Sequence, residues 1–197
     1  MKIFVIGFNK TATTTFHSLF QANGRKSYHA KEWVANFHNY DCFSDIDSQF
    51  DMLEHYDTFP DAIYILNTRK LKDWLRSRFQ YAKQHKMNWG TPASVELATK
   101  WIQMWEAKYA QILAFFQDKP NKLILVNVDL PNWMEFISNI LGFKKKQVQS
   151  INVSPIINDP TIIQVLKDTF DTLGYSEEKQ NAVMIDSPLI DLYRKNF

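Results

Sequence analysis

The stretch "IGFNKTATTTFHSLF", residues 6–20, decides the fold. It is preceded by an apolar, β-rich run, "KIFVI" (residues 2–6), which ends at Gly7. The helical periodicity of residues 13–24 places three apolar side chains on one face: Phe16, Leu19 and Phe20. A strand, a glycine turn and a helix in this order are the context that a phosphate-binding loop requires.

The lysine of this loop does not stand where an ATP-binding loop places it. In the pattern G-x-x-x-x-G-K-[ST] counted from Gly7, Ala12 replaces the second glycine and Thr13 replaces the lysine, whereas a lysine occurs three residues earlier, at Lys10. A kinase needs its lysine between the β- and γ-phosphates. Lys10 is therefore placed for a contact other than the one that a kinase lysine makes with the β- and γ-phosphates. Ala12 should be tolerated if the backbone there is not left-handed.

Length and composition predict a packed globular protein. A chain of 197 residues with 45% hydrophobic residues can bury a core as one P-loop domain over 1–197, with a core over 1–143 and a C-terminal helical extension over 144–197. The net charge of +2 argues against nucleic-acid partners. Cys42 is the only cysteine, which excludes an intrachain disulfide, and no apolar run is long enough to span a membrane. We expect a cytoplasmic protein.

The pattern along the chain alternates strands with helices. Four strands are predicted: residues 2–6, 41–46, 62–68 and 122–128. Helices are predicted over residues 13–24, 48–59, 71–86, 93–117, 131–143 and 159–173, and residues 25–40 as a loop followed by a helix. This order favours an α/β, three-layer P-loop fold with a central, mainly parallel sheet flanked by helices. Ligands bind at the carboxyl ends of such strands, where Gly7–Thr14, Asp45–Asp47 and Arg69 fall.

Two motifs resemble those of sulfotransferases that use 3′-phosphoadenosine 5′-phosphosulfate (PAPS). "NKTATTT" (residues 9–15) resembles their 5′-phosphosulfate loop, K-[ST]-G-T-T/S. Their second signature, a strand ending in arginine and a helix with a serine eight positions later, is matched by Arg69 and Ser77 in "AIYILNTRKLKDWLRS". "FPDAIYILNTRKLKDWLRSR" and "DLPNWMEFISNILGF" are similar to the small bacterial-type branch, so that the resemblance covers roughly residues 1–143.

The resemblance implies a donor site and no metal. The residues expected to hold PAPS are Lys10, Thr11, Ala12, Thr13, Thr14, Thr15, Arg69 and Ser77. Among them, Arg69 and Ser77 are expected to bind the 3′-phosphate. A cation such as Lys10 would stabilise the charge that builds on the departing bridging oxygen.

The base that removes the acceptor proton has four candidates. His29 lies in "NGRKSYHA" and Glu32 in "AKEW", which is similar to the K-E-x-x-F of carbohydrate sulfotransferases. Asp45 lies 24 residues before Arg69, where the bacterial-type branch places an aspartate, and Asp47 lies 22 before it. On a strand the two aspartates would face the same side. Asp45 and His29 are the leading candidates, and the choice stays open.

The resemblance implies a sulfotransferase that moves a sulfuryl group from PAPS to a hydroxyl or amine and releases adenosine 3′,5′-bisphosphate (PAP). The alternatives are a small P-loop nucleotide kinase and a non-catalytic nucleotide-binding module. The expected acceptor is a small molecule or a glycan. The long aromatic helix over 93–117 and residues 144–197 leave a homodimer open.

Overall fold

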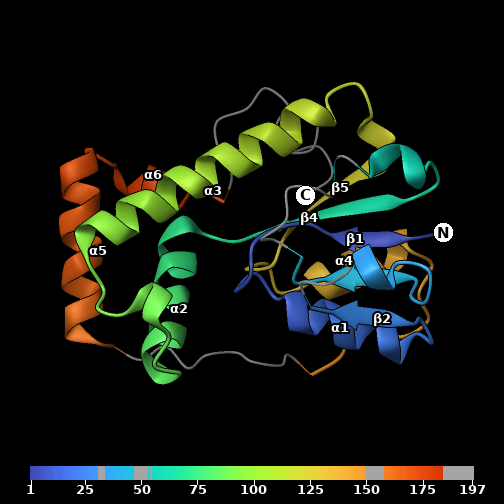
Figure 1. Cartoon of the computed structure of the whole chain (residues 1–197), viewed down its shortest axis with the longest axis horizontal. Helices are drawn as coiled ribbons and strands as arrows, with labels where there is room; N and C mark the ends of the chain where they lie inside the picture. The colour runs from blue at the N-terminus through green and yellow to red at the C-terminus, as the bar shows by residue number, and fades with distance from the viewer. Residues whose placement is uncertain (31–33, 47–52, 54, 150–157, 184–197) are drawn as a thin grey trace. The chain divides into compact units, whose positions relative to one another are not determined.

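A computed structural model describes residues 1–30, 34–46, 53, 55–149 and 158–183, which form two compact units (Figure 1). The first unit consists of Met1–Thr68 and Phe116–Asn152, and the second of Arg69–Phe115 and Val153–Phe197. The single-domain organisation with a boundary after residue 143 stays a prediction.

The first unit is built on a five-stranded sheet with the order β2-β3-β1-β4-β5, in which every neighbouring pair is parallel. The strands are β1 (Ile3–Val5), β2 (Ser27–His29), β3 (Cys42–Ser44), β4 (Ile63–Thr68) and β5 (Leu123–Asn127). The four predicted strands are all present, and the predicted α/β class is confirmed. A parallel sheet aligns the carboxyl ends of its strands at one edge.

The strand that the sequence did not predict is β2. Its three residues, Ser-Tyr-His, carry no apolar alternation, and the segment was predicted as a loop. It becomes a strand by pairing with β3, with Ser27 opposite Cys42 and His29 opposite Ser44. Tertiary pairing therefore decides its conformation rather than local propensity.

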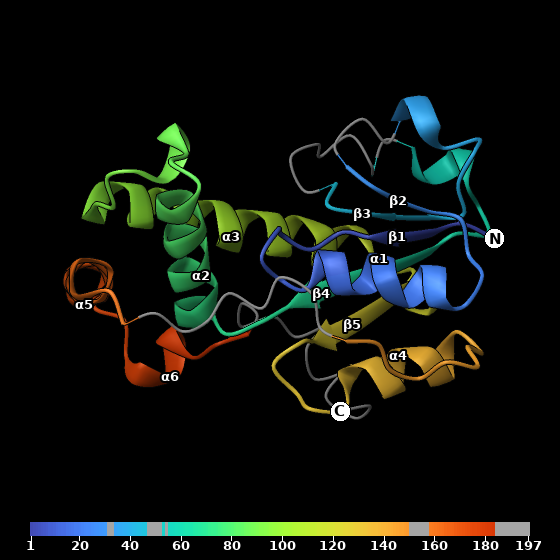
Figure 2. The same ribbon diagram turned by 90° about the horizontal axis from the view of Figure 1, so that it is seen from below.

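Different layers cover the two faces of this sheet. Helices α1 (Thr13–Ala22) and α4 (Trp133–Ile140) lie on the same face (Figure 2), where the rings of Phe16 and Trp133 have centroids 4.7 Å apart. Ile3 and Val5 belong to this core, whereas Phe4 between them faces the other side, as the two-residue period of a strand requires.

The opposite face carries an aromatic layer. The ring of Phe4 stacks on Phe43 and Tyr64, with centroids 5.1 and 5.4 Å away. Tyr56 of the 3-10 turn η3 (Tyr56–Thr58) stacks on Tyr64 of this layer, and two further 3-10 turns of the unit are η1 (Val34–Asn36) and η5 (Pro120–Lys122). Half of the residues predicted as a helix over 48–59 lie outside the described residues, and the described half contains the 3-10 turn η3.

The second unit is helical in the residues that the structure describes. It contains α2 (Leu71–Gln84), η4 (Asn88–Gly90), α3 (Val95–Phe115), α5 (Pro160–Leu173) and α6 (Glu177–Gln180). Helix α3 packs against α2 and α5, and its buried face includes Trp101, Trp105 and Tyr109. No helix within the described ranges combines the length and apolar character needed to cross a bilayer.

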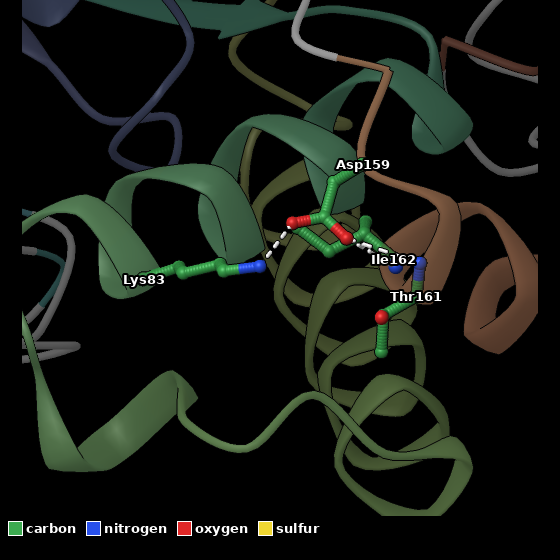
Figure 3. Close-up of polar contacts among 4 residues, drawn as sticks. All are labelled: Lys83, Asp159, Thr161 and Ile162. Carbon is green, nitrogen blue, oxygen red and sulfur yellow. Dashed lines mark hydrogen bonds and ion pairs between the residues drawn. The ribbon is translucent and has the colours of Figure 1, made fainter.

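The start of α5 shows how a single carboxylate joins two helices of this unit (Figure 3). Asp159 is the N-cap, and its Oδ1 accepts hydrogen bonds from the backbone N–H groups of Thr161 and Ile162, at 3.0 and 3.4 Å. Its Oδ2 pairs with Nζ of Lys83 on α2, at 2.5 Å. The hydrogen bond from Lys83 is the main reason why the pKa of Asp159 lies below its ordinary value. This contact fixes where α5 begins.

Candidate functional site

The N-terminal loop, residues 7–12, is fastened to β4 through the side chain of Asn67. The amide of Asn67 accepts a hydrogen bond from the Gly7 N–H at 2.8 Å through Oδ1. Its Nδ2 lies 2.6 Å from both the carbonyl oxygen and Oγ1 of Thr11. Asn67 and Thr11 are completely buried. Both ends of the loop are therefore tied to the strand beside β1.

Gly7 is required by the closeness of this contact. A Cβ atom at position 7 would lie 1.9 Å from the backbone oxygen of Asn67 and 2.5 Å from its Oδ1. Neither backbone can move without breaking the β1–β4 pairing of which these residues are the continuation. The glycine that opens the motif therefore serves close packing of the loop on β4.

The loop passes twice through the left-handed region of backbone conformation. The φ angles of Lys10 and Ala12 are 63° and 64°. The condition under which Ala12 was expected to replace glycine without cost is therefore not met, since a left-handed L-residue costs roughly 1–2 kcal/mol. Strain held in a loop by tight anchoring is typical of ligand sites.

Ala12 is also the N-cap of α1, and its side chain makes no capping hydrogen bond. The first turn of α1 contains no acidic residue that would compete with an anion. Among the threonines of this turn, Thr13 and Thr15 are buried and Thr14 is partly exposed. The start of α1 is thus electrostatically suited to an anionic group from a ligand.

His29, at the end of β2, lies beside this helix start. Its Nδ1 is 2.8 Å from Oγ of Ser44, and its Nε2 is 3.3 Å from Oγ1 of Thr14. The ring of His17 is close to that of His29, with centroids 5.3 Å apart, and Nδ1 of His17 is 2.9 Å from Oγ of Ser27. The fold therefore brings one predicted base next to the predicted donor loop.

Both imidazoles are held in the neutral form near neutral pH. Burial lowers the pKa of His29 below its ordinary value. Burial also lowers the pKa of His17, and the positive charge that His29 would carry lowers it further. A neutral imidazole has one nitrogen lone pair available for a proton, which is the requirement for a general base.

Asp45 lies just beyond the strand in which the sequence placed it, because β3 ends at Ser44 and Asp45 adopts a left-handed φ of 63°. Aspartate tolerates this conformation better than most residues because of its short polar side chain. Asp47 and Glu32 lie outside the described residues. Asp45 still follows a strand end in the same edge of the sheet as His29.

Arg69 and Ser77 both belong to the second unit. Arg69 directly follows the last residue of β4, and Ser77 lies in α2. Both side chains are partly exposed. Their joint role in holding a 3′-phosphate stays a prediction.

Groups of three or more His, Cys, Asp or Glu residues suited to a metal ion do not occur in the part of the chain that the structure describes. The expectation of a site without metal stays a prediction.

Sequence reasoning missed Asn67, Ser44 and His17. Asn67 had a signal, because it is a polar residue within the buried run "AIYILNT". Ser44 and His17 had none, since only the pairing of β2 with β3 and the packing of α1 beside β2 bring them to His29.

A comparison with protein families matches residues 2–123, more than half of the chain, to the model of the sulfotransferase domain. The chain belongs to the sulfotransferase domain family. The resemblance inferred from the two motifs is thereby confirmed, and membership suggests sulfuryl transfer in general. A comparison with curated proteins found no match. The matched part of the chain includes the N-terminal loop, His29, Arg69 and Ser77.

Proposed function

We propose that this sulfotransferase transfers the sulfuryl group of PAPS to a hydroxyl or amine of a small-molecule or glycan acceptor and releases PAP. The observation that carries the proposal is the position of His29, whose Nε2 lies 3.3 Å from Thr14 Oγ1 in the first turn after the N-terminal loop. A base and an anion-binding helix start then meet at one place, as group transfer to a neutral acceptor requires.

The donor would supply a sulfuryl group whose bond to the bridging oxygen breaks as the acceptor oxygen or nitrogen bonds to sulfur. Residues Thr11 to Thr15 would bind its 5′-phosphosulfate through backbone N–H groups at the start of α1. Ala12 favours this arrangement because it provides no competing cap. Lys10 would stabilise the negative charge that grows on the bridging oxygen.

His29 would take the proton from the acceptor at Nε2. Its neutral state near pH 7 and its place next to Thr14 support this role. Asp45, at the end of the neighbouring strand, is the second candidate. Arg69 and Ser77 would hold the 3′-phosphate, the group that distinguishes PAP from other adenine nucleotides. We further propose that the protein is cytoplasmic, works without metal, and has no nucleic-acid partner; a homodimer is compatible with these proposals.

Thermal unfolding tests the donor. At a concentration of PAP one hundred times its dissociation constant, binding should stabilise the protein by about 2.7 kcal/mol, which corresponds to a rise in melting temperature of several degrees. ATP with Mg²⁺ should give little shift. Arg69→Ala should abolish most of the shift caused by PAP, whereas Lys72→Ala, an exposed cation on α2, should leave it unchanged. Equal shifts with both nucleotides would contradict the 3′-phosphate site and favour a kinase-like loop.

Turnover tests the reaction. With PAPS carrying a radioactive sulfuryl group and a panel of phenols, sugars and amines, we expect transfer that persists in EDTA, since a kinase would lose its Mg²⁺. Lys10→Ala and His29→Gln should each slow transfer by about 10²-fold or more. If PAP binds, Lys10→Ala leaves that binding intact and no acceptor is modified, the protein is a non-catalytic binding module.

A further inference from the structure

Ser44 makes the tighter of the two contacts to the imidazole of His29. The distance from its Oγ to Nδ1 is 2.8 Å, compared with 3.3 Å between Thr14 Oγ1 and Nε2. Ser44 has no exposed surface, whereas Thr14 is partly exposed. Water cannot replace the hydroxyl of a buried serine if it is removed, so the contact to Ser44 is the one that determines the ring orientation.

Strand pairing makes this contact rigid. Ser44 and His29 are register partners in the parallel pair β2–β3, at the last residue of each strand. Side chains on sheet strands are held more accurately than side chains on loops. The partner of one imidazole nitrogen decides which nitrogen carries the proton. A hydroxyl accepting from Nδ1–H leaves the lone pair on Nε2, the nitrogen that lies beside the start of α1.

We propose that Ser44 is a positioning residue, which accepts a hydrogen bond from Nδ1–H of His29 and thereby keeps Nε2 unprotonated and directed to the start of α1. This inference rests on the proposed function, since it explains the tautomer and the ring orientation of His29, the proposed base. The looser partner, Thr14, can yield its place at Nε2 to the hydroxyl of an acceptor without disturbing the ring. The proton then moves from the acceptor oxygen to Nε2, while Nδ1–H keeps its hydrogen bond to Ser44 Oγ.

The opposite arrangement makes a different prediction. If the Ser44 hydroxyl donated to Nδ1, the proton would lie on Nε2 and face Thr14, and His29 would be unable to accept a proton there. Ring-nitrogen NMR of isotope-labelled protein distinguishes the two tautomers directly. His29→Gln assigns the signals among the five histidines. This measurement needs neither donor nor acceptor.

The variant Ser44→Ala tests the positioning. At about pH 8, where the imidazoles are neutral, the wild type should show the Nδ1–H tautomer of His29, and Ser44→Ala should show a mixture of tautomers. Ser44→Thr, which keeps the hydroxyl, should restore the wild-type spectrum. Ser27→Ala is the matched control, because it removes the hydroxyl that contacts His17 and should alter the signals of His17 only. An Nε2–H tautomer in the wild type, or an unchanged tautomer in Ser44→Ala, would overturn the proposal.

Kinetics provide the second readout. Ser44→Ala should lower kcat about tenfold, with the KM for PAPS and the binding of PAP unchanged, since the donor contacts remain. Ser138→Ala, which removes another completely buried serine hydroxyl in the same unit, should leave kcat unchanged. A change of tautomer without a change of kcat would refute the positioning role. If PAP fails to bind while the tautomer responds to Ser44→Ala, the donor assignment fails and the positioning of His29 by Ser44 is upheld.

Discussion

Replacing Asn67 by alanine should destabilise the first unit and disable the N-terminal loop at the same time. The substitution removes the acceptor of the Gly7 N–H and the donor to the carbonyl and hydroxyl of Thr11. Gly7 and Thr11 are both buried, so water cannot replace the lost partners.

The magnitude follows from the number of groups left without a partner. A buried backbone group that loses its hydrogen bond costs about 1–3 kcal/mol, and the bond to the Thr11 hydroxyl adds about 1 kcal/mol. For the two backbone groups and this hydroxyl, we expect Asn67→Ala to lower the free energy of unfolding by about 3–7 kcal/mol. That is a large part of the about 5–15 kcal/mol by which a typical domain is stable.

Urea unfolding followed by circular dichroism measures this loss, and the shift in melting temperature with PAP measures the loop. Asn127→Ala is the matched control: Asn127 ends the adjacent strand β5 and is partly exposed, and its Oδ1 accepts one hydrogen bond, from the N–H of Asp129 at 3.0 Å. We expect Asn127→Ala to lower the free energy of unfolding by about 0.5–1.5 kcal/mol and to leave the shift in melting temperature with PAP unchanged. If Asn67→Ala costs no more than the control and still binds PAP, the fastening of the loop by Asn67 is refuted.

Three further perturbations test separate features. Ala12→Gly should raise the free energy of unfolding by about 0.5–1 kcal/mol in urea titrations, because relief of the left-handed strain exceeds the extra flexibility of glycine in the unfolded chain. Asp159→Ala should lower the free energy of unfolding by about 1 kcal/mol, because α5 loses its N-cap, whereas Asp159→Asn keeps the cap. Lys83→Met removes only the ion pair at the surface and should change the free energy of unfolding by less than about 0.5 kcal/mol. His17→Gln should flatten the acid side of the stability–pH profile, measured by urea unfolding between about pH 7.5 and pH 5.

The sign of the pH effect follows from linkage. The pKa of His17 is lower in the folded state than its ordinary value of 6.5, so the unfolded chain binds more protons than the folded chain at pH values between these two pKa values. The stability contributed by the neutral imidazole is fully present above about pH 6.5 and is lost as the pH falls through the folded pKa. A wild type that gains stability on acidification through this range would contradict the cause assigned to the pKa shift of His17.

For Ala12→Gly, a loss of stability would contradict the strain assigned to Ala12. For Asp159→Ala, a gain of stability would contradict the cap assigned to Asp159.

The sequence was most informative where local chemistry and tertiary structure agree. β1, β4 and β5 are mainly apolar runs that are largely buried, and α1, α2, α3 and α5 each have a buried apolar face. The loop between β1 and α1 could be located because glycine, lysine and threonines occur there at fixed positions. These features depend on residues close together in the chain.

The rest depends on pairing between distant segments. β2 is too short to have a pattern, and without it the contact from His29 to Ser44 cannot be inferred. The left-handed backbone of Ala12 and Asp45 also escaped prediction, because alanine is not a residue that indicates this conformation and the strand predicted through Asp45 was too long. The N-terminal loop could thus be located from the sequence, but the residues that hold the loop and His29 could not, and the catalytic role of His29 stays a prediction.

Chemical labelling of the Cys42 thiol can be used to detect opening of the sheet. Cys42 is the single cysteine of the chain, it lies within β3 with no exposed surface, and burial raises its pKa to about 12. The thiolate, and not the thiol, is the nucleophile that attacks maleimides and disulfide reagents. In the native protein at neutral pH, modification must therefore wait until β3 separates from its neighbours, so that labelling, followed by mass spectrometry, reports this opening without any engineered probe.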